Sequence, residues 1–261
     1  MPSDTIGILA GMGPRSTAPF IDLIVAECQR QCGAKNDIDF PPMMIYSLPT
    51  PFYVDRPIDH GAMRGTICAG LQRLAAADVA FIAMPCNSAH IYYDQLTRCI
   101  SVQLLNMVEI AVHAIPTSAS RIALLGTRPT VAAGLYQPAI ADGGRECVTH
   151  ERIQQRVDRL IQTIKTSPDH RPAGAQWNDL MDELVKQHVD TVLIACTDLN
   201  VVSTSYRGPM TLVDATHCLA AEIVQEWTQI DHPNIARSAR HRNGHLEGNG
   251  VPSEWSSGRQ W

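Results

Sequence analysis

The chain has 261 residues, of which 45% are hydrophobic and 18% charged, and its net charge is −5. This composition is typical of a globular protein with one large domain or two lobes of ordinary size. The acidic balance and the lack of a basic run in the folded part argue against nucleic-acid binding. Because no apolar run reaches the ~18 residues of a membrane span, we expect no membrane association.

The start of the chain and its cysteines indicate a compartment. No basic segment precedes the first apolar run, which argues against a signal peptide and predicts a cytoplasmic protein. The eight cysteines do not follow the spacing of a small secreted disulfide framework. Cys28, Cys68 and Cys218 fall inside apolar patterns, where a free cysteine behaves as a small hydrophobe. We therefore expect most of the eight to be reduced thiols.

The first half of the chain alternates apolar runs with amphipathic stretches, the pattern of βαβ units around a parallel sheet. The expected strands are Ile6–Ala10, Pro42–Ser47 and Val79–Met84. The expected helices are Ser16–Gln31, Ala62–Ala76, one that begins in Ala89–Cys99, and Val108–Ala114. The turn Gly11–Pro14 follows the first strand, and the proline-rich loop Leu48–Pro57 follows the second.

The same pattern restarts after Pro116–Ser120, which we interpret as the junction between two lobes. The expected strands of the second half are Ile122–Leu125, Val192–Ala195 and the short Thr211–Val213. The expected helices are one from about Thr130, then Glu151–Thr166, Asp179–His188 and Ala215–Gln229. The segment Ser167–Gly174 contains Pro and Gly and is expected to be a loop.

These elements predict an α/β fold of two similar Rossmann-like lobes, an internal repeat with parallel sheets flanked by helices. We assign residues 1–115 and 210–231 to lobe 1 and residues 116–209 to lobe 2. Residues 232–261 are rich in Asn, Gly, Ser, Arg and His and lack an apolar period, so we predict a disordered tail. Alternatively, Trp255 and Trp261 dock on the folded part.

Two segments of the chain repeat the same sequence pattern. Val79–His90 (VAFIAMPCNSAH) and Thr191–Leu199 (TVLIACTDL) are apolar runs that end in Cys86 and Cys196. Ligands of open α/β sheets bind outside the carboxyl ends of the strands, so we expect both thiols in the cleft between the lobes. A helix that starts after each cysteine would attract an anion and lower the pKa of the thiol.

Small polar residues surround the two cysteines. Donor side chains are expected from Asn87, Ser88, Thr127, Thr197 and Thr17. Two thiols that face each other beside a carboxylate site are what a cofactor-free racemase needs, because one removes the α-proton and the other delivers a proton to the opposite face. The alternative is that each cysteine is simply a small buried residue.

A zinc site fits the residues less well. Cys86 and His90 form a C-x3-H pair that Cys196 and His217 could complete. Structural zinc usually comes with tight C-x2-4-C pairs, and neither Cys86 nor Cys196 belongs to one, so we expect no metal. His90 is expected instead to be a hydrogen-bonding residue that tunes the Cys86 thiol.

Nucleotide and pyridoxal phosphate sites fit poorly as well. The glycines after the first strand are Gly7, Gly11 and Gly13, but Ser16 stands where a dinucleotide fingerprint needs its third glycine. Pyridoxal phosphate requires a Schiff-base lysine. The chain has only Lys35, Lys165 and Lys186, each in a polar context expected to be exposed.

The chain resembles the PLP-independent aspartate/glutamate racemases, whose superfamily also includes glutamate racemase, hydantoin racemase, maleate isomerase and arylmalonate decarboxylase. The resemblance runs from about Thr5 to Trp227. It rests on IGILAGMG after Thr5, MPCNSAH around Cys86, LLGTRPT around Thr127 and ACTDL around Cys196.

The resemblance implies a homodimer without a cofactor that acts on a small amino acid, aspartate or glutamate, held between the lobes. Cys86 and Cys196 would be the two acid/base residues. The substrate-binding residues would be Met12, Thr17, Arg56, Asn87, Ser88, Thr127, Thr197 and Asp198. Arg56 corresponds to an arginine that the family carries after a proline-rich loop; otherwise it is a solvated loop residue.

Three departures from the family pattern leave the substrate more open than the reaction. Asp198 stands where glutamate is usual, and Ala195 where glycine is common. Gln154, flanked by Arg152 and Arg156, aligns with a lobe 2 lysine that holds the side-chain carboxylate in related aspartate racemases. The alternatives are a relative that acts on another amino acid or isomerises or decarboxylates a diacid, or a binding protein that has lost activity.

Overall fold

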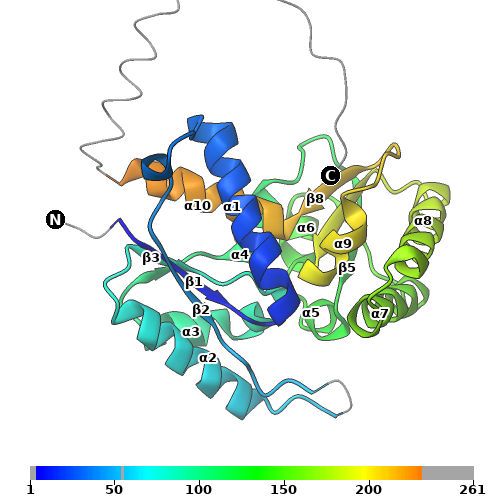
Figure 1. The fold of residues 1–261 in the computed structure, drawn as a ribbon. Coiled ribbons are helices and arrows are strands. Elements are labelled where there is room, and N and C mark those ends of the chain that lie inside the picture. Colours follow the sequence, from blue (N-terminus) through cyan, green and yellow to red (C-terminus); the bar gives the residue numbers. More distant parts are fainter. Residues whose placement is uncertain (1–3, 54–55, 231–261) are drawn as a thin grey trace, which may run out of the picture.

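Two four-stranded parallel sheets form the centres of two lobes in the computed structural model of the chain, which describes residues 4–53 and 56–230 (Figure 1). The first sheet has the order β2-β1-β3-β4, with β1 (Ile6–Ala10), β2 (Met43–Ser47), β3 (Phe81–Ala83) and β4 (Gln103–Leu104). The second has the order β6-β5-β7-β8, with β5 (Arg121–Gly126), β6 (Glu146–Val148), β7 (Thr191–Ala195) and β8 (Thr211–Asp214). Both orders place the strands in the same sequence, so the predicted repeat is confirmed.

Helices flank both sheets. In the first half they are α1 (Thr17–Cys32), α2 (His60–Ala75), α3 (Tyr93–Leu96) and α4 (Met107–His113). In the second half they are α5 (Arg128–Ala132), α6 (Gln137–Asp142), α7 (Glu151–Thr166), α8 (Arg171–Lys186), α9 (Asn200–Ser203) and α10 (Ala215–Gln229). The 3-10 turns are η1 (Pro14–Ser16), η2 (Asp37–Asp39), η3 (Asn87–Tyr92), η4 (Thr97–Cys99) and η5 (Thr197–Leu199).

Two of the expected elements differ in the structure, and two strands are additional. Helix α8 already begins at Arg171, inside the segment expected to be a loop, because Pro172 suits the first helical turn and Trp177 is buried. The single helix expected in Ala89–Cys99 is divided into η3, α3 and η4. Strands β4 and β6 were not expected, since two or three residues are too short for a recognisable period.

The segment 210–231, which we assigned to lobe 1, is divided between the lobes. Strand β8 pairs in parallel with β7, with Thr211 opposite Thr191, and so belongs to the second sheet. Helix α10 instead packs against α1 and α4 of the first lobe. The short apolar run of β8 did not indicate which sheet it joins.

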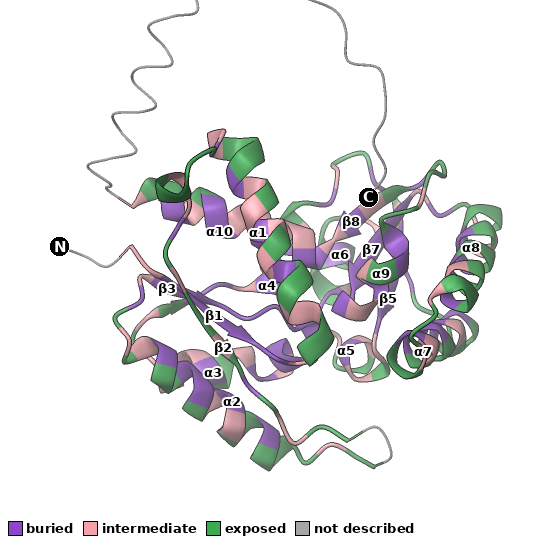
Figure 2. Ribbon diagram, in the orientation of Figure 1, coloured by how far each residue is buried: buried purple, intermediate pink, exposed green. Residues whose placement is uncertain are grey.

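One hydrophobic core extends through both lobes, and two others cover the outer faces of the sheets (Figure 2). The shared core joins α1, α4 and α10 to one face of each sheet, for example through Ile8, Leu193 and Ile223. The outer face of the first sheet packs against α2, and that of the second against α7 and α8. The shared core therefore fixes the two sheets relative to each other, which positions the strand ends that face the cleft.

Cys68 on α2 and Cys99 on η4 form a disulfide, so the expectation of reduced thiols is wrong for this pair. The two residues lie 31 positions apart in the sequence but have Cα atoms 6.0 Å apart, because α2 packs against η4. The free thiols of the described residues are Cys28, Cys32, Cys86, Cys147, Cys196 and Cys218.

Within residues 4–53 and 56–230, no helix has the length and hydropathy that crossing a bilayer would need. The predicted tail, residues 232–261 with Trp255 and Trp261, lies outside the described residues.

Candidate active site

Cys86 and Cys196 lie at equivalent strand ends and line one cavity. Cys86 follows β3 and is the residue before η3, and Cys196 follows β7 and is the residue before η5. Both have extended backbone conformations and are almost buried, with exposed fractions of 8% and 6%. The cavity has a volume of about 400 Å³ and takes its walls from both lobes. The structure thus brings the two predicted thiols together in the cleft.

A hydroxyl accompanies the first thiol. The Sγ atom of Cys86 lies 3.5 Å from Oγ of Ser88. Burial raises the pKa of Cys86, while hydrogen bonds from the Ser88 hydroxyl and the Ala89 N–H act in the opposite direction. The expectation that the following helix lowers this pKa is therefore wrong in net effect, because the loss of water around a buried thiol outweighs one short 3-10 turn.

His90 supports the backbone of Cys86 rather than its thiol. The N–H of Met107 donates to Nε2 of His90 at 3.2 Å, so the proton of the ring is on Nδ1, which donates to the carbonyl oxygen of Cys86 at 2.9 Å. Burial lowers the pKa of His90 and keeps the ring neutral. Since both ring nitrogens are engaged, His90 does not fit the zinc alternative, and the described residues contain no group of three possible metal ligands.

A carboxylate accompanies the second thiol. The thiol of Cys196 donates to Oδ2 of Asp198 at 3.7 Å, and Nζ of Lys165 lies 2.9 Å from the same oxygen. Burial and the negative charge of Asp198 raise the pKa of Cys196. Here too the net effect is opposite to the lowering expected from a helix start.

Lys165 is a site residue that sequence reasoning missed. It lies at the end of α7, lines the cavity and keeps only 35% of its side chain exposed. Gln154, which we aligned with the family lysine, is buried and donates to the carbonyl of Gly126 and the carboxylate of Asp158. Lys165 lies on the same helical face as Gln154, about three turns further on. The helical period of α7 was therefore the signal in the sequence that could have identified Lys165.

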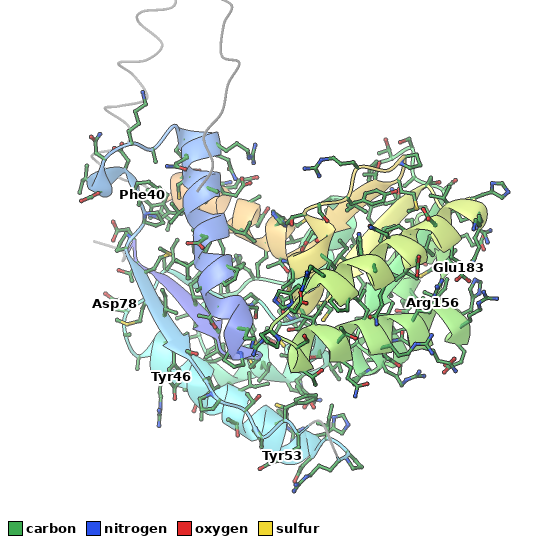
Figure 3. The ribbon with its side chains drawn as sticks, turned by 45° about the vertical axis from the view of Figure 1, so that its right-hand side comes forward. Phe40, Tyr46, Tyr53, Asp78, Arg156 and Glu183 are labelled. Carbon is green, nitrogen blue, oxygen red and sulfur yellow. A yellow bond between two sulfur atoms is a disulfide. The ribbon has the colours of Figure 1, made fainter. Side chains whose placement is uncertain are left out.

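The two arginines beside Gln154 also lie outside the site. Arg156 on α7 points toward Glu183 on α8, with which it forms an ion pair on the outside of lobe 2 (Figure 3). Arg152 pairs with the same carboxylate and is 81% exposed. Neither side chain can replace Lys165 in the cleft.

A tyrosine of lobe 2 orients Asn87 of lobe 1. The buried Tyr136 hydroxyl donates to Oδ1 of Asn87, which leaves the Nδ2 group of Asn87 without a partner within the described part of the chain. Asn87 lines the cavity, so its free donor is held beside the thiols. Sequence reasoning did not find Tyr136, because its contact with Asn87 joins residues 49 positions apart.

The remaining predicted residues divide into lining and supporting groups. Met12, Thr127 and Thr197 line the cavity, and Thr127 also accepts from the N–H of Thr130 at the start of α5. Thr17 does not line it, and its Oγ1 accepts from the N–H of Gly11 and so holds the turn after β1. Arg56 is exposed on the loop after β2, outside the lining, with its guanidinium 4.3 Å from the centre of the Tyr53 ring.

An apolar wall completes the cavity and was not predicted. It consists of Phe52, Ile58, Met63, Ile67 and Tyr92. These residues come from the loop after β2, from α2 and from η3. The lining of the cavity therefore combines two thiols and an ion pair with apolar side chains.

Comparison with known proteins identifies the family. Residues 9–223 match the Asp/Glu/hydantoin racemase family, which is most of the chain. The chain belongs to this family. It is 44% identical over 222 residues to the broad specificity amino-acid racemase RacX of Bacillus subtilis (strain 168), a match that covers 85% of this chain and 97% of that protein. The protein is therefore an enzyme of the isomerase class.

Solved structures share the fold. The aspartate racemase of Picrophilus torridus aligns with a TM-score of 0.74 at 23% identity and covers 90% of this chain and 98% of its own. The glutamate racemase isoform RacE1 of Bacillus anthracis aligns with a TM-score of 0.66 at 15% identity and covers 90% and 86%. At these identities the similarity establishes the two-lobed α/β fold.

Proposed function

We propose that the protein is a cofactor-independent amino-acid racemase in which Cys86 and Cys196 exchange protons with opposite faces of the α-carbon. The observation that carries the proposal is that both thiols, from equivalent ends of β3 and β7, line a single cavity of about 400 Å³ between the lobes. The 44% identity to an amino-acid racemase supports the same reaction.

The α-carboxylate would lie against donors from both lobes. The residues that follow each cysteine, Asn87 and Ser88 in one lobe and Thr197 and Asp198 in the other, begin 3-10 turns whose first N–H groups have no partner inside the turn. Asn87 adds its free Nδ2 group. Removal of the α-proton places negative charge on this carboxylate, and each well-placed donor contributes about 3 kcal/mol to stabilising that charge.

The neighbours of the thiols define their resting roles. The thiol of Cys196 donates a hydrogen bond to Asp198 and so serves as the acid, while the Ser88 hydroxyl and the Ala89 N–H stabilise the thiolate that forms when Cys86 acts as the base. The Cys86 thiolate takes the α-proton of one enantiomer, and the Cys196 thiol delivers its proton to the opposite face. The product leaves a Cys86 thiol and a Cys196 thiolate, the state that accepts the other enantiomer.

Aspartate and glutamate are the first candidate substrates. Lys165 offers a cation at the wall of the cavity, and a substrate carboxylate would compete with Asp198 for it. Met12, Thr17 and Thr127 would shape or support the binding site, and Arg56 would attract a dicarboxylate by its positive charge. An amino acid without a side-chain carboxylate is the second candidate, because Lys165 already has a partner and the similar Bacillus racemase has broad specificity.

Proton NMR in D2O tests the proposal. Purified protein, treated with hydroxylamine to remove any pyridoxal phosphate, is incubated with L-aspartate, L-glutamate or L-alanine, and chiral chromatography follows the products. We expect loss of the α-proton signal and appearance of the D-enantiomer without an added cofactor. Loss of activity after hydroxylamine treatment would contradict cofactor independence, and isomerisation of an unsaturated diacid without amino-acid exchange would favour the diacid alternative.

The family resemblance also leads us to propose a cytoplasmic homodimer. Sedimentation equilibrium of the full chain measures its mass in solution. A mass of twice 28.6 kDa is expected, and a monomer at micromolar concentration would contradict the dimer.

A further inference from the structure

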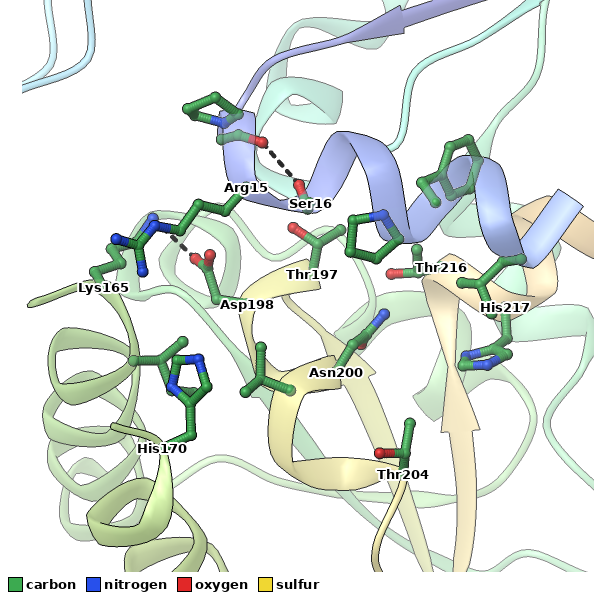
Figure 4. Close-up of a pocket in the computed structure, with 17 residues that line it drawn as sticks. Arg15, Ser16, Lys165, His170, Thr197, Asp198, Asn200, Thr204, Thr216 and His217 are labelled. Atoms are coloured by element: carbon green, nitrogen blue, oxygen red, sulfur yellow. Dashed lines mark hydrogen bonds and ion pairs between the residues drawn. The ribbon is translucent and has the colours of Figure 1, made fainter. Parts of the chain in front are cut away.

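A second cavity adjoins the candidate active site (Figure 4). Its volume is about 640 Å³, and it lies among the start of α1, the end of α7, the η5–α9 segment and the start of α10. It shares five lining residues with the cavity of the two cysteines: Gly13, Pro14, Lys165, Thr197 and Asp198. The proposed proton transfers use no residue found only in the second cavity.

The wall between the two cavities contains the Lys165–Asp198 ion pair. The pair is 2.9 Å long, and its two side chains are 35% and 16% exposed. A Cβ atom built on Gly13 would lie 3.9 Å from Nζ of Lys165, so the ammonium group lies beside the turn that leads from β1 to α1. An ion pair that is partly exposed favours its closed arrangement by roughly fivefold or less. Rotation of the Lys165 side chain, the more exposed partner, would open the wall at this pair.

The second cavity combines an apolar wall with polar atoms that lack partners. The wall is formed by Pro14, Pro19, Phe20, Leu23, Ile164 and Val201. Asn200 Oδ1 and Thr216 Oγ1 are buried without a hydrogen-bond partner within the described residues, and Thr216 is only 2% exposed. Figure 4 shows both side chains beside the cavity. Water or a polar group of a bound molecule in this space can pair both atoms.

We infer that the second cavity is a side-chain subsite, which receives long, unbranched amino-acid side chains that pass the Lys165–Asp198 pair. The inference rests on the proposed function, since it requires an amino acid whose α-carbon lies between the cysteines. The thiols and the carboxylate donors hold the atoms that all amino acids share, so the side chain is the part that must extend elsewhere. Each methylene buried against the apolar wall would increase affinity about fourfold.

Filling the second cavity from its far side tests the inference. Val201 lies on α9, is 46% exposed and lines only the second cavity, so Val201→Trp places an indole there without touching the cysteines. α-Proton exchange in D2O is measured with L-norleucine, which has a four-carbon side chain, and with L-alanine, whose methyl group cannot reach the wall. We expect wild-type kcat/KM to be higher for L-norleucine. Val201→Trp should lower it about tenfold or more for L-norleucine and leave L-alanine within twofold.

Val185→Trp is the matched control. Val185 lies on α8, is 39% exposed and lines neither cavity, so both amino acids should behave as in the wild type. Thr204→Trp, at another exposed position of the same cavity, should repeat the effect of Val201→Trp.

The outcomes separate this inference from the proposed function. Wild-type exchange of L-alanine or L-aspartate but not of L-norleucine, or an equal effect of Val201→Trp on short and long substrates, would overturn the subsite and leave the racemase intact. Absence of exchange for every amino acid would overturn the proposed function and the subsite with it.

Discussion

The two lobes have the same strand order but surround their cysteines with different chemistry. The residue two positions after Cys86 is Ser88, and the residue two positions after Cys196 is Asp198. Each side chain returns to its own thiol, the hydroxyl at 3.5 Å and the carboxylate at 3.7 Å. The duplicated fold thus supplies a symmetric geometry, while the neighbours of the thiols differ: the Ser88 hydroxyl acts to lower the pKa of Cys86, and the charge of Asp198 raises the pKa of Cys196.

Removal of either thiol should have the largest effect on racemisation. We expect Cys86→Ala and Cys196→Ala each to lower racemisation by about 10²–10⁴-fold, because each removes an acid/base group. Each variant should still exchange the α-proton of one enantiomer through its remaining thiol, and the two variants should exchange opposite enantiomers. Chiral chromatography measures racemisation, and NMR in D2O measures the exchange of each enantiomer.

Cys147→Ala is the matched control, since Cys147 is a free cysteine of β6 that lines neither cavity. It should racemise as the wild type does. Full activity in either Cys86→Ala or Cys196→Ala would show that two thiols are not required.

Substitution of the side chains beside the two thiols should move the two thiol pKa values in opposite directions. Asp198→Asn removes the charge that raises the pKa of Cys196 and frees Lys165, so this pKa should fall. Ser88→Ala removes a hydrogen bond that lowers the pKa of Cys86, so that pKa should rise. Since one pKa unit changes the thiolate fraction about tenfold, iodoacetamide at pH 8 should alkylate Cys196 roughly tenfold faster in the first variant and Cys86 more slowly in the second.

Mass spectrometry of the labelled peptides follows each cysteine separately. Since burial raises both pKa values, alkylation of both thiols should accelerate as the pH rises. Unchanged rates in both variants would contradict the assignment of acid and base.

Loss of the contact that crosses the cleft should have a smaller effect. Tyr136→Phe removes the hydroxyl that fixes the amide of Asn87, and a neutral hydrogen bond of this kind contributes about 0.5–1.5 kcal/mol. We expect KM to rise about two- to tenfold, with kcat less affected. Tyr206→Phe, which loses a hydroxyl that accepts from the N–H of Met210 in lobe 2, should leave KM unchanged. Equal KM values in both variants would contradict the role of Tyr136.

The smallest effect is expected from the loop after β2. Because Arg56 is exposed and lies outside the cavity lining, Arg56→Ala should raise KM for L-aspartate about threefold or less and leave KM for L-alanine unchanged. Arg98→Ala, at an exposed position of lobe 1 that lines neither cavity, is the control. If both amino acids respond equally to Arg56→Ala, Arg56 does not recognise a side-chain carboxylate.

The local sequence pattern was sufficient to predict those parts of the structure that depend on residues close together in the chain. The apolar runs before Cys86 and Cys196 predicted β3 and β7, and the repeated motif predicted that the two thiols share a cleft. A strand buried on both faces needs a continuous apolar run, and a parallel sheet brings its carboxyl ends to one edge. Both rules need only the order of residues along the chain, so they could be used without the structure.

Contacts between distant segments were decided by the tertiary structure alone. Lys165 reaches the cleft because the core on the outer face of the second sheet holds α7 against η5, and β8 joins the second sheet although α10 packs on the first lobe. The thiol pKa values rise because folding removes water from both cysteines, which their sequence neighbours do not reveal. The sequence therefore determined the repeat and its two thiols. Packing decided which charges and hydroxyls surround them, because burial and long-range contacts exist only in the folded chain.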